Sequence, residues 1–225
     1  MRISATVSVL GALAVVIGVA GCGSGGDGDG GATTDTAASS ASETSTSAAG
    51  GQTVGDYLTA NGVTQTIVKA GDPGVPGVEL PMPDGWEPVT DASDVPQDVY
   101  GAIYLSAGKG TQNPPAILAR MARLDGGTFD VATILELAPN AVTRLPGWDG
   151  PVTGTPSELG GFQATAIAGQ ADVDGTPNFV ARKTVVIPGP ENTFLLALDA
   201  QGPVDQRQAL TDAMAVIDER TTISP

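Results

Sequence analysis

Hydrophobic and polar positions divide the chain into three parts with different patterns. Residues 5–20 are apolar or small, residues 23–51 carry only small or polar side chains, and large apolar side chains recur regularly from residue 53 onward. Only the third part can bury enough apolar surface to offset the conformational entropy lost on folding. We therefore expect one globular domain over residues 53–225.

Within this domain, the spacing of apolar residues predicts a sheet. Seven apolar runs have the length of strands: residues 65–68, 78–80, 101–106, 117–124, 162–171, 178–187 and 193–199. Val173-Asp-Gly-Thr176 is a strong hairpin signal between the fifth and sixth runs, and residues 188–192 are rich in turn formers. The last three runs are therefore predicted to be consecutive antiparallel strands.

Three further segments have helical periodicity. Thr53 and Asp56 resemble a capping box that opens a short helix, which closes at Asn61-Gly62. A second helix should begin behind Asp130, with a kink or a restart at Pro139, and a third should occupy residues 204–219. Strands separated by one long helix and closed by another predict an α+β fold with a mainly antiparallel sheet.

The N-terminal parts of the chain indicate export and anchoring. Arg2 precedes the apolar run, and Val19-Ala20-Gly21 leads to Cys22, the single cysteine of the sequence. This order resembles the lipobox of bacterial lipoproteins, which implies cleavage before Cys22 and acylation of its thiol. The alternative, an uncleaved membrane helix, needs about 20 apolar residues, and the run is shorter. We expect residues 1–21 to be a signal peptide and Cys22 to be lipid-anchored, facing outside the cytoplasm.

Residues 22–52 are predicted to be the acylated cysteine followed by a flexible linker, because no large apolar side chain is available to fold them. A coil of this length has an end-to-end distance of about 30 Å, so the domain should be tethered but free to tilt. The Thr/Ser-rich residues 33–47 are compatible with O-linked sugars, although a bare linker is the preferred interpretation.

Charge and missing residue types exclude several functions. The formal net charge is −15, which argues against binding nucleic acid or adhering electrostatically to anionic lipid. Histidine is absent, so histidine-based catalytic triads and the commonest metal ligand are unavailable. Asp172-Val-Asp-Gly175 does not match a calcium loop, and Gly160-Gly161 lacks the residues of a phosphate loop. We expect no cofactor, no metal and no catalytic residues.

A few side chains have both a structural and a functional interpretation. Trp86 and Trp148 end two turns, where core packing is preferred and the alternative is that they rim an apolar groove for a lipid or glycolipid. Arg120 and Arg123 are interpreted as surface charges, with sugar or carboxylate binding as the alternative. Asp91, Asp94 and Asp98 are interpreted as a solvated loop, although paired carboxylates also serve glycoside hydrolysis.

Nine motifs carry a resemblance to a known family. They are Thr53-Val-Gly-Asp-Tyr-Leu58, Gly71-Asp-Pro-Gly74, Leu80-Pro-Met-Pro-Asp-Gly-Trp86, Tyr100-Gly-Ala-Ile103, Glu136-Leu-Ala-Pro139, Leu145-Pro-Gly-Trp148, Leu159-Gly-Gly161, Lys183-Thr-Val-Val-Ile-Pro188 and Val216-Ile-Asp-Glu219. Together they resemble the LpqN/LpqT lipoproteins of mycobacteria and related actinobacteria. The resemblance implies a Mog1p/PsbP-like α/β/α sandwich in the cell envelope of a mycolate-bearing cell. It carries over no catalytic set, and Cys22 alone transfers as a functional residue.

Three hypotheses about function follow from these observations. The first is a non-enzymatic envelope factor that docks on a protein partner, such as a lipid exporter, and supports the transport or assembly of envelope lipids, since the resemblance links one family member to the export of trehalose-mycolate lipids. The second is a carrier that holds a hydrophobic lipid or glycolipid in a groove of the domain. The third, least favoured, is a glycan hydrolase that uses carboxylates alone.

Overall fold

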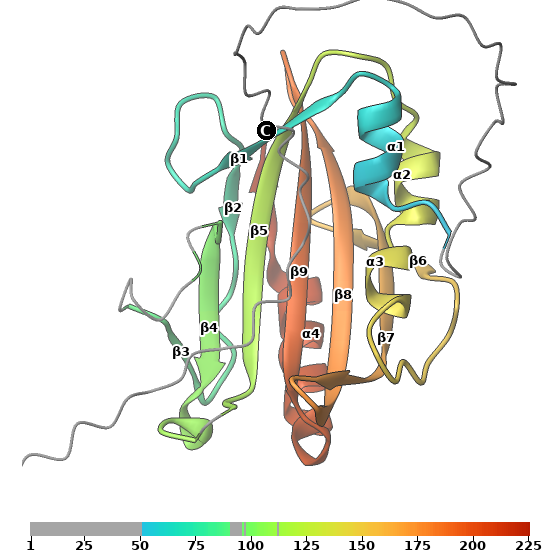
Figure 1. The fold of residues 1–225 in the computed structure, drawn as a ribbon. Coiled ribbons are helices and arrows are strands. Elements are labelled where there is room, and N and C mark those ends of the chain that lie inside the picture. Colours follow the sequence, from blue (N-terminus) through green and yellow to red (C-terminus); the bar gives the residue numbers. More distant parts are fainter. Residues whose placement is uncertain (1–50, 91–95, 97, 112) are drawn as a thin grey trace, which may run out of the picture.

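The computed structural model describes residues 51–90, 96, 98–111 and 113–225. The expected signal peptide, Cys22 and residues 23–50 of the expected linker lie outside these residues. The described residues of the domain form a mixed α/β structure around an antiparallel sheet (Figure 1). This confirms the expected mixed α/β class with a mainly antiparallel sheet.

The sheet described by these residues has eight strands, all paired in antiparallel fashion. They are β1 (Thr64–Val68), β3 (Trp86–Pro88), β4 (Gly101–Leu105), β5 (Ala116–Asp125), β6 (Thr155–Leu159), β7 (Phe162–Val173), β8 (Thr176–Pro188) and β9 (Thr193–Pro203). Their order is β3-β4-β5-β9-β8-β7-β6. β1 and β4 pair with successive halves of one edge of β5, and a separate pair joins β2 (Gly77–Glu79) to β10 (Thr222–Ser224).

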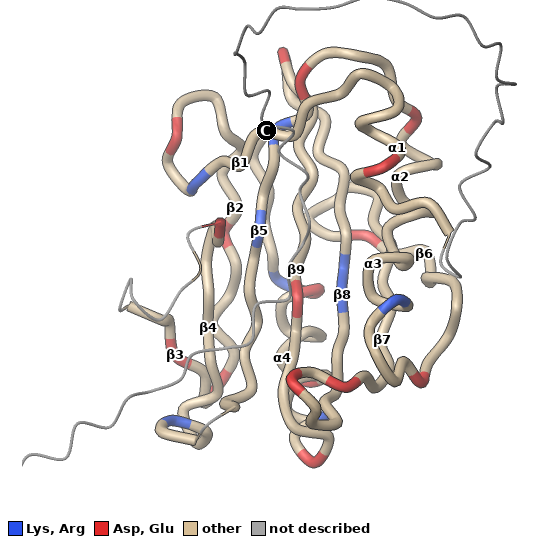
Figure 2. The backbone as a smooth tube through the Cα atoms, viewed as in Figure 1, with Lys and Arg blue, Asp and Glu red and all other residues tan. Residues whose placement is uncertain are grey.

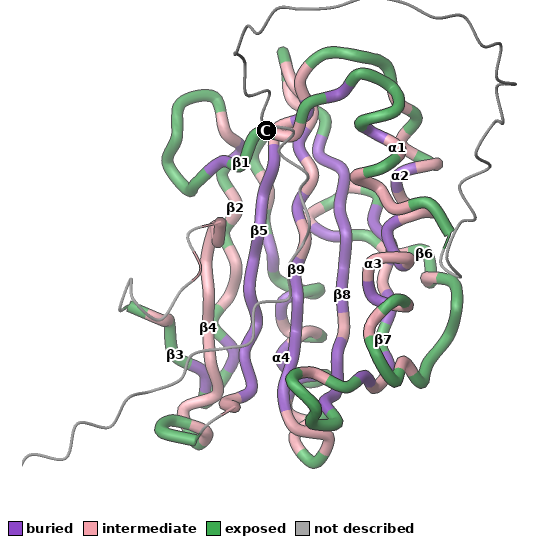
Figure 3. Tube along the Cα trace, viewed as in Figure 1, coloured by how far each residue is buried: buried purple, intermediate pink, exposed green. Residues whose placement is uncertain are grey.

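Helices cover both faces of the sheet. α4 (Arg207–Arg220) packs on one face, and α1 (Val54–Ala60), α2 (Val131–Leu137) and α3 (Asn140–Thr143) pack on the other (Figure 1). Side chains alternate between the faces because successive residues of a strand point to opposite sides. Leu196 and Leu198 of β9 accordingly belong to the core that includes α4, whereas Leu195 packs against the cluster that includes α1 and α2. The result is a three-layer arrangement whose central strands are largely buried (Figure 3).

Local sequence signals explain where several elements begin and end. Asp174 and Gly175 adopt φ values of 51° and 75° in the β7–β8 turn, as a tight hairpin with two left-handed residues requires. Thr53 and Asp56 form the expected capping box, and Asp130 caps α2 by accepting a hydrogen bond from the Thr133 backbone at 2.8 Å. Of the two expected outcomes at Pro139, the structure has the restart, so α2 and α3 are two short helices.

Trp86 lies in the larger apolar core, with 6% of its surface exposed. It begins β3, opposite Leu105 of β4, and shares this core with residues of α4. The turn that precedes it therefore directs a large ring into the interior. This placement agrees with the core interpretation of Trp86.

Replacing Trp86 with Ala should lower the free energy of unfolding by about 3–5 kcal/mol, because the substitution leaves a large cavity in a packed core. Urea denaturation followed by circular dichroism measures this loss. Val152→Ala is the control, since Val152 is 77% exposed and its truncation should change stability by no more than about 0.5 kcal/mol. Similar losses for the two variants would contradict the core placement.

Candidate functional site

A cavity of about 680 Å³ lies on the sheet face that carries α1, α2 and α3. Its floor comes from β1, β5, β8 and β9, and its sides come from the start of α1, from α3 and from the β7–β8 hairpin. Its lining residues include Thr53, Val54, Gly55, Asp56, Ile67, Asp98, Arg120, Ala122, Ala141, Arg144, Leu145, Asp172, Asp174, Arg182, Leu195 and Ala197. This volume falls within the range of natural small-molecule sites.

Small side chains explain why space remains here. Two separate apolar clusters pack on this face, one around Leu58 and Ile134 and the other around Val142 and Ile167. On the adjacent floor, β5 and β9 contribute Ala122 and Ala197, which project little volume above the sheet. The three helices therefore cover this face only in part. The opposite face differs, because the buried core that includes α4 draws on seven of the eight strands of the sheet.

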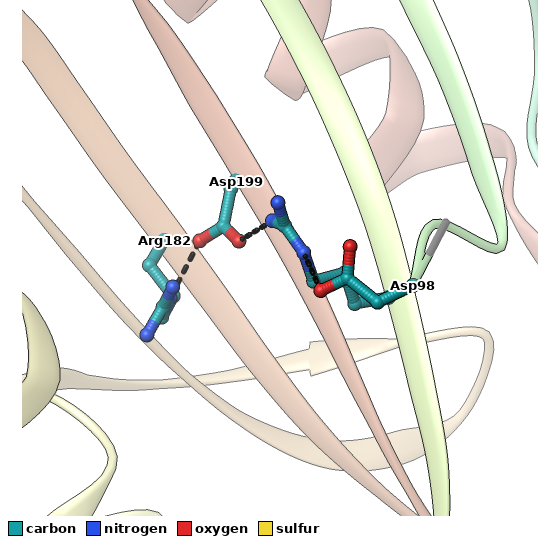
Figure 4. A network of polar contacts seen from close by, with 4 residues as sticks. Asp98, Arg182 and Asp199 are labelled. Carbon is teal, nitrogen blue, oxygen red and sulfur yellow. Dashed lines mark hydrogen bonds and ion pairs between the residues drawn. The ribbon is translucent and has the colours of Figure 1, made fainter. Parts of the chain in front are cut away.

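A chain of four alternating charges crosses the floor of the cavity (Figure 4). The Arg120 side chain donates from Nε to Asp98 at 2.9 Å and from Nη1 to Asp199 at 2.8 Å. Arg182 donates from Nε to the other Asp199 oxygen at 2.5 Å. Arg182 and Asp199 are direct cross-strand partners in β8 and β9, and Arg120 reaches from β5 on the far side of β9 (Figure 2). Asp199 thus joins three central strands.

Arg182 has hydrogen-bonding capacity that the described residues leave unused. Its side chain is 7% exposed, and Nη2 is buried without a hydrogen-bond partner. An unsatisfied buried donor costs about 1–3 kcal/mol, so native proteins almost always provide it with an acceptor. Because Arg182 also lines the cavity, an oxygen atom of a bound ligand would fill that role once the atoms that cover Nη2 move aside.

The charges around the cavity favour an uncharged polar group over an anion. Four carboxylates and three guanidinium groups line it: Asp56, Asp98, Asp172 and Asp174, with Arg120, Arg144 and Arg182. Hydrogen bonds from the Thr53 side chain and backbone hold the pKa of Asp56 below its ordinary value, so this carboxylate is charged at neutral pH. An added anion would meet a slight excess of negative charge. A hydroxyl or carbonyl oxygen would accept from Arg182 without that penalty.

Comparisons with known proteins place the chain in a family. The family model described as "Probable lipoprotein LpqN" matches residues 51–224. The chain belongs to the LpqN lipoprotein family. Lipoprotein LpqN of Mycobacterium tuberculosis (strain ATCC 25618 / H37Rv) is 39% identical over 173 residues, which cover 77% of this chain and 74% of that protein.

A solved structure supports the same assignment. The crystal structure of LpqN involved in cell envelope biogenesis of Mycobacterium tuberculosis matches with a TM-score of 0.71 at 39% identity. The match covers 77% of this chain and 98% of the crystallised chain. The resemblance seen in the nine sequence motifs is therefore confirmed, as is a mixed α/β domain with a mainly antiparallel sheet.

The two tryptophans proposed to rim a groove do not line the cavity of this LpqN-family domain. Trp86 is in the core, and Trp148 packs between Gly150 and Gly169 while its Nε1 donates to the Pro151 carbonyl at 3.1 Å. A Cβ atom at either glycine would lie 2.7 Å from the Trp148 ring. Both rings therefore fill space within the fold, and the cavity forms where bulky side chains are missing.

The structure also places two of the charged residues, Arg120 and Asp98, in a different environment from the one that the sequence suggested. Arg120 is buried in the charge chain, and Asp98 pairs with it, so neither is a simple surface charge. Arg123 does match the surface interpretation, because its partner is the partly exposed Asp125 at 2.8 Å. Asp91 and Asp94 lie outside the described residues.

Sequence reasoning missed Arg182 and Asp199 of this LpqN-family protein. Arg182 stands beside Lys183 within the mostly apolar strand β8, and Asp199 follows the apolar run Leu195-Leu-Ala-Leu in β9. A charge at a core-facing position of a central strand is rare unless the charge is paired. Opposite charges at such positions on two neighbouring predicted strands were the signal that could have indicated a buried ion pair.

The described residues contain neither a metal-binding cluster nor a membrane-spanning helix. No group of three or more Asp, Glu, His or Cys side chains within the described ranges is arranged to hold a metal ion. Among the same residues, no helix combines the length and the apolar composition needed to cross a membrane.

Replacing Asp199 with Asn should destabilise the domain by about 3–5 kcal/mol, because two buried guanidinium groups would lose their shared counter-charge. Urea denaturation provides the measurement. Asp125→Asn removes the carboxylate of an ion pair of the same 2.8 Å length at a partly exposed position, and it should cost about 1 kcal/mol or less. Equal losses would show that the buried charge chain does not stabilise the fold.

Proposed function

We propose that this LpqN-family protein is a membrane-tethered envelope lipoprotein whose domain binds an amphiphilic lipid or glycolipid, without enzymatic turnover. The cavity with the unsatisfied Arg182 donor is the observation that carries this proposal. The relation to a protein involved in cell envelope biogenesis supports a role in the transport or assembly of envelope lipids. Of the three hypotheses drawn from the sequence, the cavity favours the carrier.

The chemistry of the cavity matches the two ends of an amphiphile. Apolar side chains, including Ile67, Leu195 and Leu145, offer surface to an alkyl chain. Arg182 offers a donor to a hydroxyl or carbonyl oxygen, and the surrounding carboxylates discourage an anionic head group. A neutral head group bearing hydroxyls therefore fits better than a free fatty acid or a phosphate.

The anchor and the partner belong to the same proposal. An acylated Cys22 would keep the domain within reach of the membrane, and an envelope protein such as a lipid exporter would deliver or receive the lipid. The family assignment supports the lipoprotein and envelope part, because one member of this family is involved in cell envelope biogenesis, and the exporter as partner stays a prediction. The Mog1p/PsbP-like relationship of the fold stays a prediction.

Replacing Cys22 with Ala should move the protein from the membrane to the soluble fraction, because the thiol is the group that accepts the diacylglyceryl moiety and lipid attachment depends on that step. Detergent-phase partitioning and fractionation of expressing cells measure the shift. Ser24→Ala, close to the same cleavage site, should remain in the membrane fraction. Unchanged partitioning of Cys22→Ala would contradict the proposed lipid anchor at Cys22.

Binding of n-dodecyl-β-D-maltoside below its critical micelle concentration tests the cavity by calorimetry. The protein for this test is the mature, unacylated chain, residues 22–225 with Cys22→Ser. We expect saturable binding of one molecule, and at least fivefold weaker binding for Arg182→Met, because the hydrogen bond to the head group is lost. Ile67→Ser should also weaken binding by removing apolar contact, and dodecanoate should bind less tightly than the maltoside.

The control for the apolar wall is Val152→Ser, since Val152 is exposed like Ile67 but does not line the cavity. Its affinity should equal that of the unmodified chain. Circular dichroism shows whether each variant is folded. The carrier proposal fails if the unmodified chain does not bind the maltoside, or if Ile67→Ser and Val152→Ser bind it equally well.

A further inference from the structure

The described chain enters the domain along the edge of the cavity. Residues 51–56, which we call the entry strap, run from the linker into the first turn of α1. The Gln52 carbonyl accepts a hydrogen bond from Asn140 Nδ2 at 2.8 Å, and the Gly51 carbonyl accepts from Arg144 Nη2. These contacts join segments that are 88 and 93 residues apart in the sequence. They seat the entry strap on α3.

The two segments that these contacts join, the entry strap and α3, each contribute residues to the cavity lining. Thr53, Val54, Gly55 and Asp56 contribute from the entry strap, and Ala141, Arg144 and Leu145 contribute from α3 and the residues after it. Asn140 is not a lining residue and reaches the entry strap from outside the cavity. Its effect on a ligand would therefore be indirect, through the position of the wall.

A capping box ties the entry strap to the first turn of α1. The Asp56 carboxylate accepts from the Thr53 backbone at 2.9 Å and from its hydroxyl at 2.6 Å, and the Asp56 backbone donates to the Thr53 hydroxyl at 3.1 Å. These bonds fix Thr53 against the first turn of α1, so the contact that Gln52 makes with α3 bears on the position of the adjoining wall residues.

We propose that Asn140 is a positioning residue that couples the tether to the cavity, by seating the entry strap as part of the cavity wall. This inference rests on the proposed ligand binding. A ligand that contacts both the entry strap and α3 stabilises their contact, and the seated strap in turn raises the affinity for the ligand. Such coupling is reciprocal by thermodynamic necessity. Occupancy of the cavity thereby controls how firmly the tether is held where it joins the domain.

The test compares Asn140→Ala with Asn61→Ala in the mature, unacylated chain. Asn61 is the matched control, because its Nδ2 also donates to a backbone carbonyl at 2.8 Å, that of Tyr57, at the other end of α1 and away from the cavity. Each variant loses one side-chain to backbone hydrogen bond. Binding of n-dodecyl-β-D-maltoside should be about fivefold weaker for Asn140→Ala and unchanged for Asn61→Ala.

Hydrogen exchange supplies a readout that a purely structural role would not change. In the unmodified chain and in Asn61→Ala, the maltoside should slow exchange of the backbone amides of residues 53–57. In Asn140→Ala this dependence on the maltoside should be reduced or lost. If the unmodified chain binds the maltoside but the two variants match in affinity and exchange, the coupling is wrong while the carrier stands. If the unmodified chain does not bind it, the carrier itself fails.

Discussion

The carboxylate of Asp199 is shared by two arginines, and this buried interaction organises the centre of the sheet. Arg120 and Arg182 come from the strands on either side of β9, so one carboxylate links three strands at their middle. Breaking such a pair is costly because a buried charge would be left unpaired. The same interaction fixes the direction of both guanidinium groups, and it leaves Nη2 of the cavity-lining Arg182 buried without a partner among the described residues. Stability and the proposed binding chemistry thus depend on the same atoms.

The parts of the fold that local sequence determines could be predicted. The β7–β8 turn follows from Asp174-Gly175, and the start of α1 follows from the Thr53 capping box, because each depends on a few neighbouring residues. The short strands β3, β6 and β10 were not predicted. β3 and β10 pair with segments that are not adjacent in the sequence, whereas β6 pairs with β7 across Gly160-Gly161, and the burial patterns of all three are mostly exposed. Pairing of that kind has no periodic signature in so few residues.

The cavity could not be predicted for a related reason. The cavity exists because the side chains of several segments, distant in the sequence, leave space empty, as they do above Ala122 and Ala197. Large aromatic residues were the more conspicuous candidates in the sequence, but Trp86 and Trp148 are large enough to complete the packing of the fold. Arg120 similarly gave no sign of burial by itself, since its partner Asp199 lies 79 residues away in the sequence.

The charge of the protein and the position of the entry strap together suggest how the domain would meet a lipid. A net charge of −15 repels anionic surfaces, so adhesion of the domain to such a membrane is opposed. An acyl anchor would supply proximity without requiring that contact, and the linker would set a reach of about 30 Å. Because the tether joins the domain at the cavity wall, the anchor and the bound lipid would both act on the same region of the molecule. A carrier arranged in this way can approach a lipid source and leave it again, since what holds it near the membrane is separate from what holds the lipid.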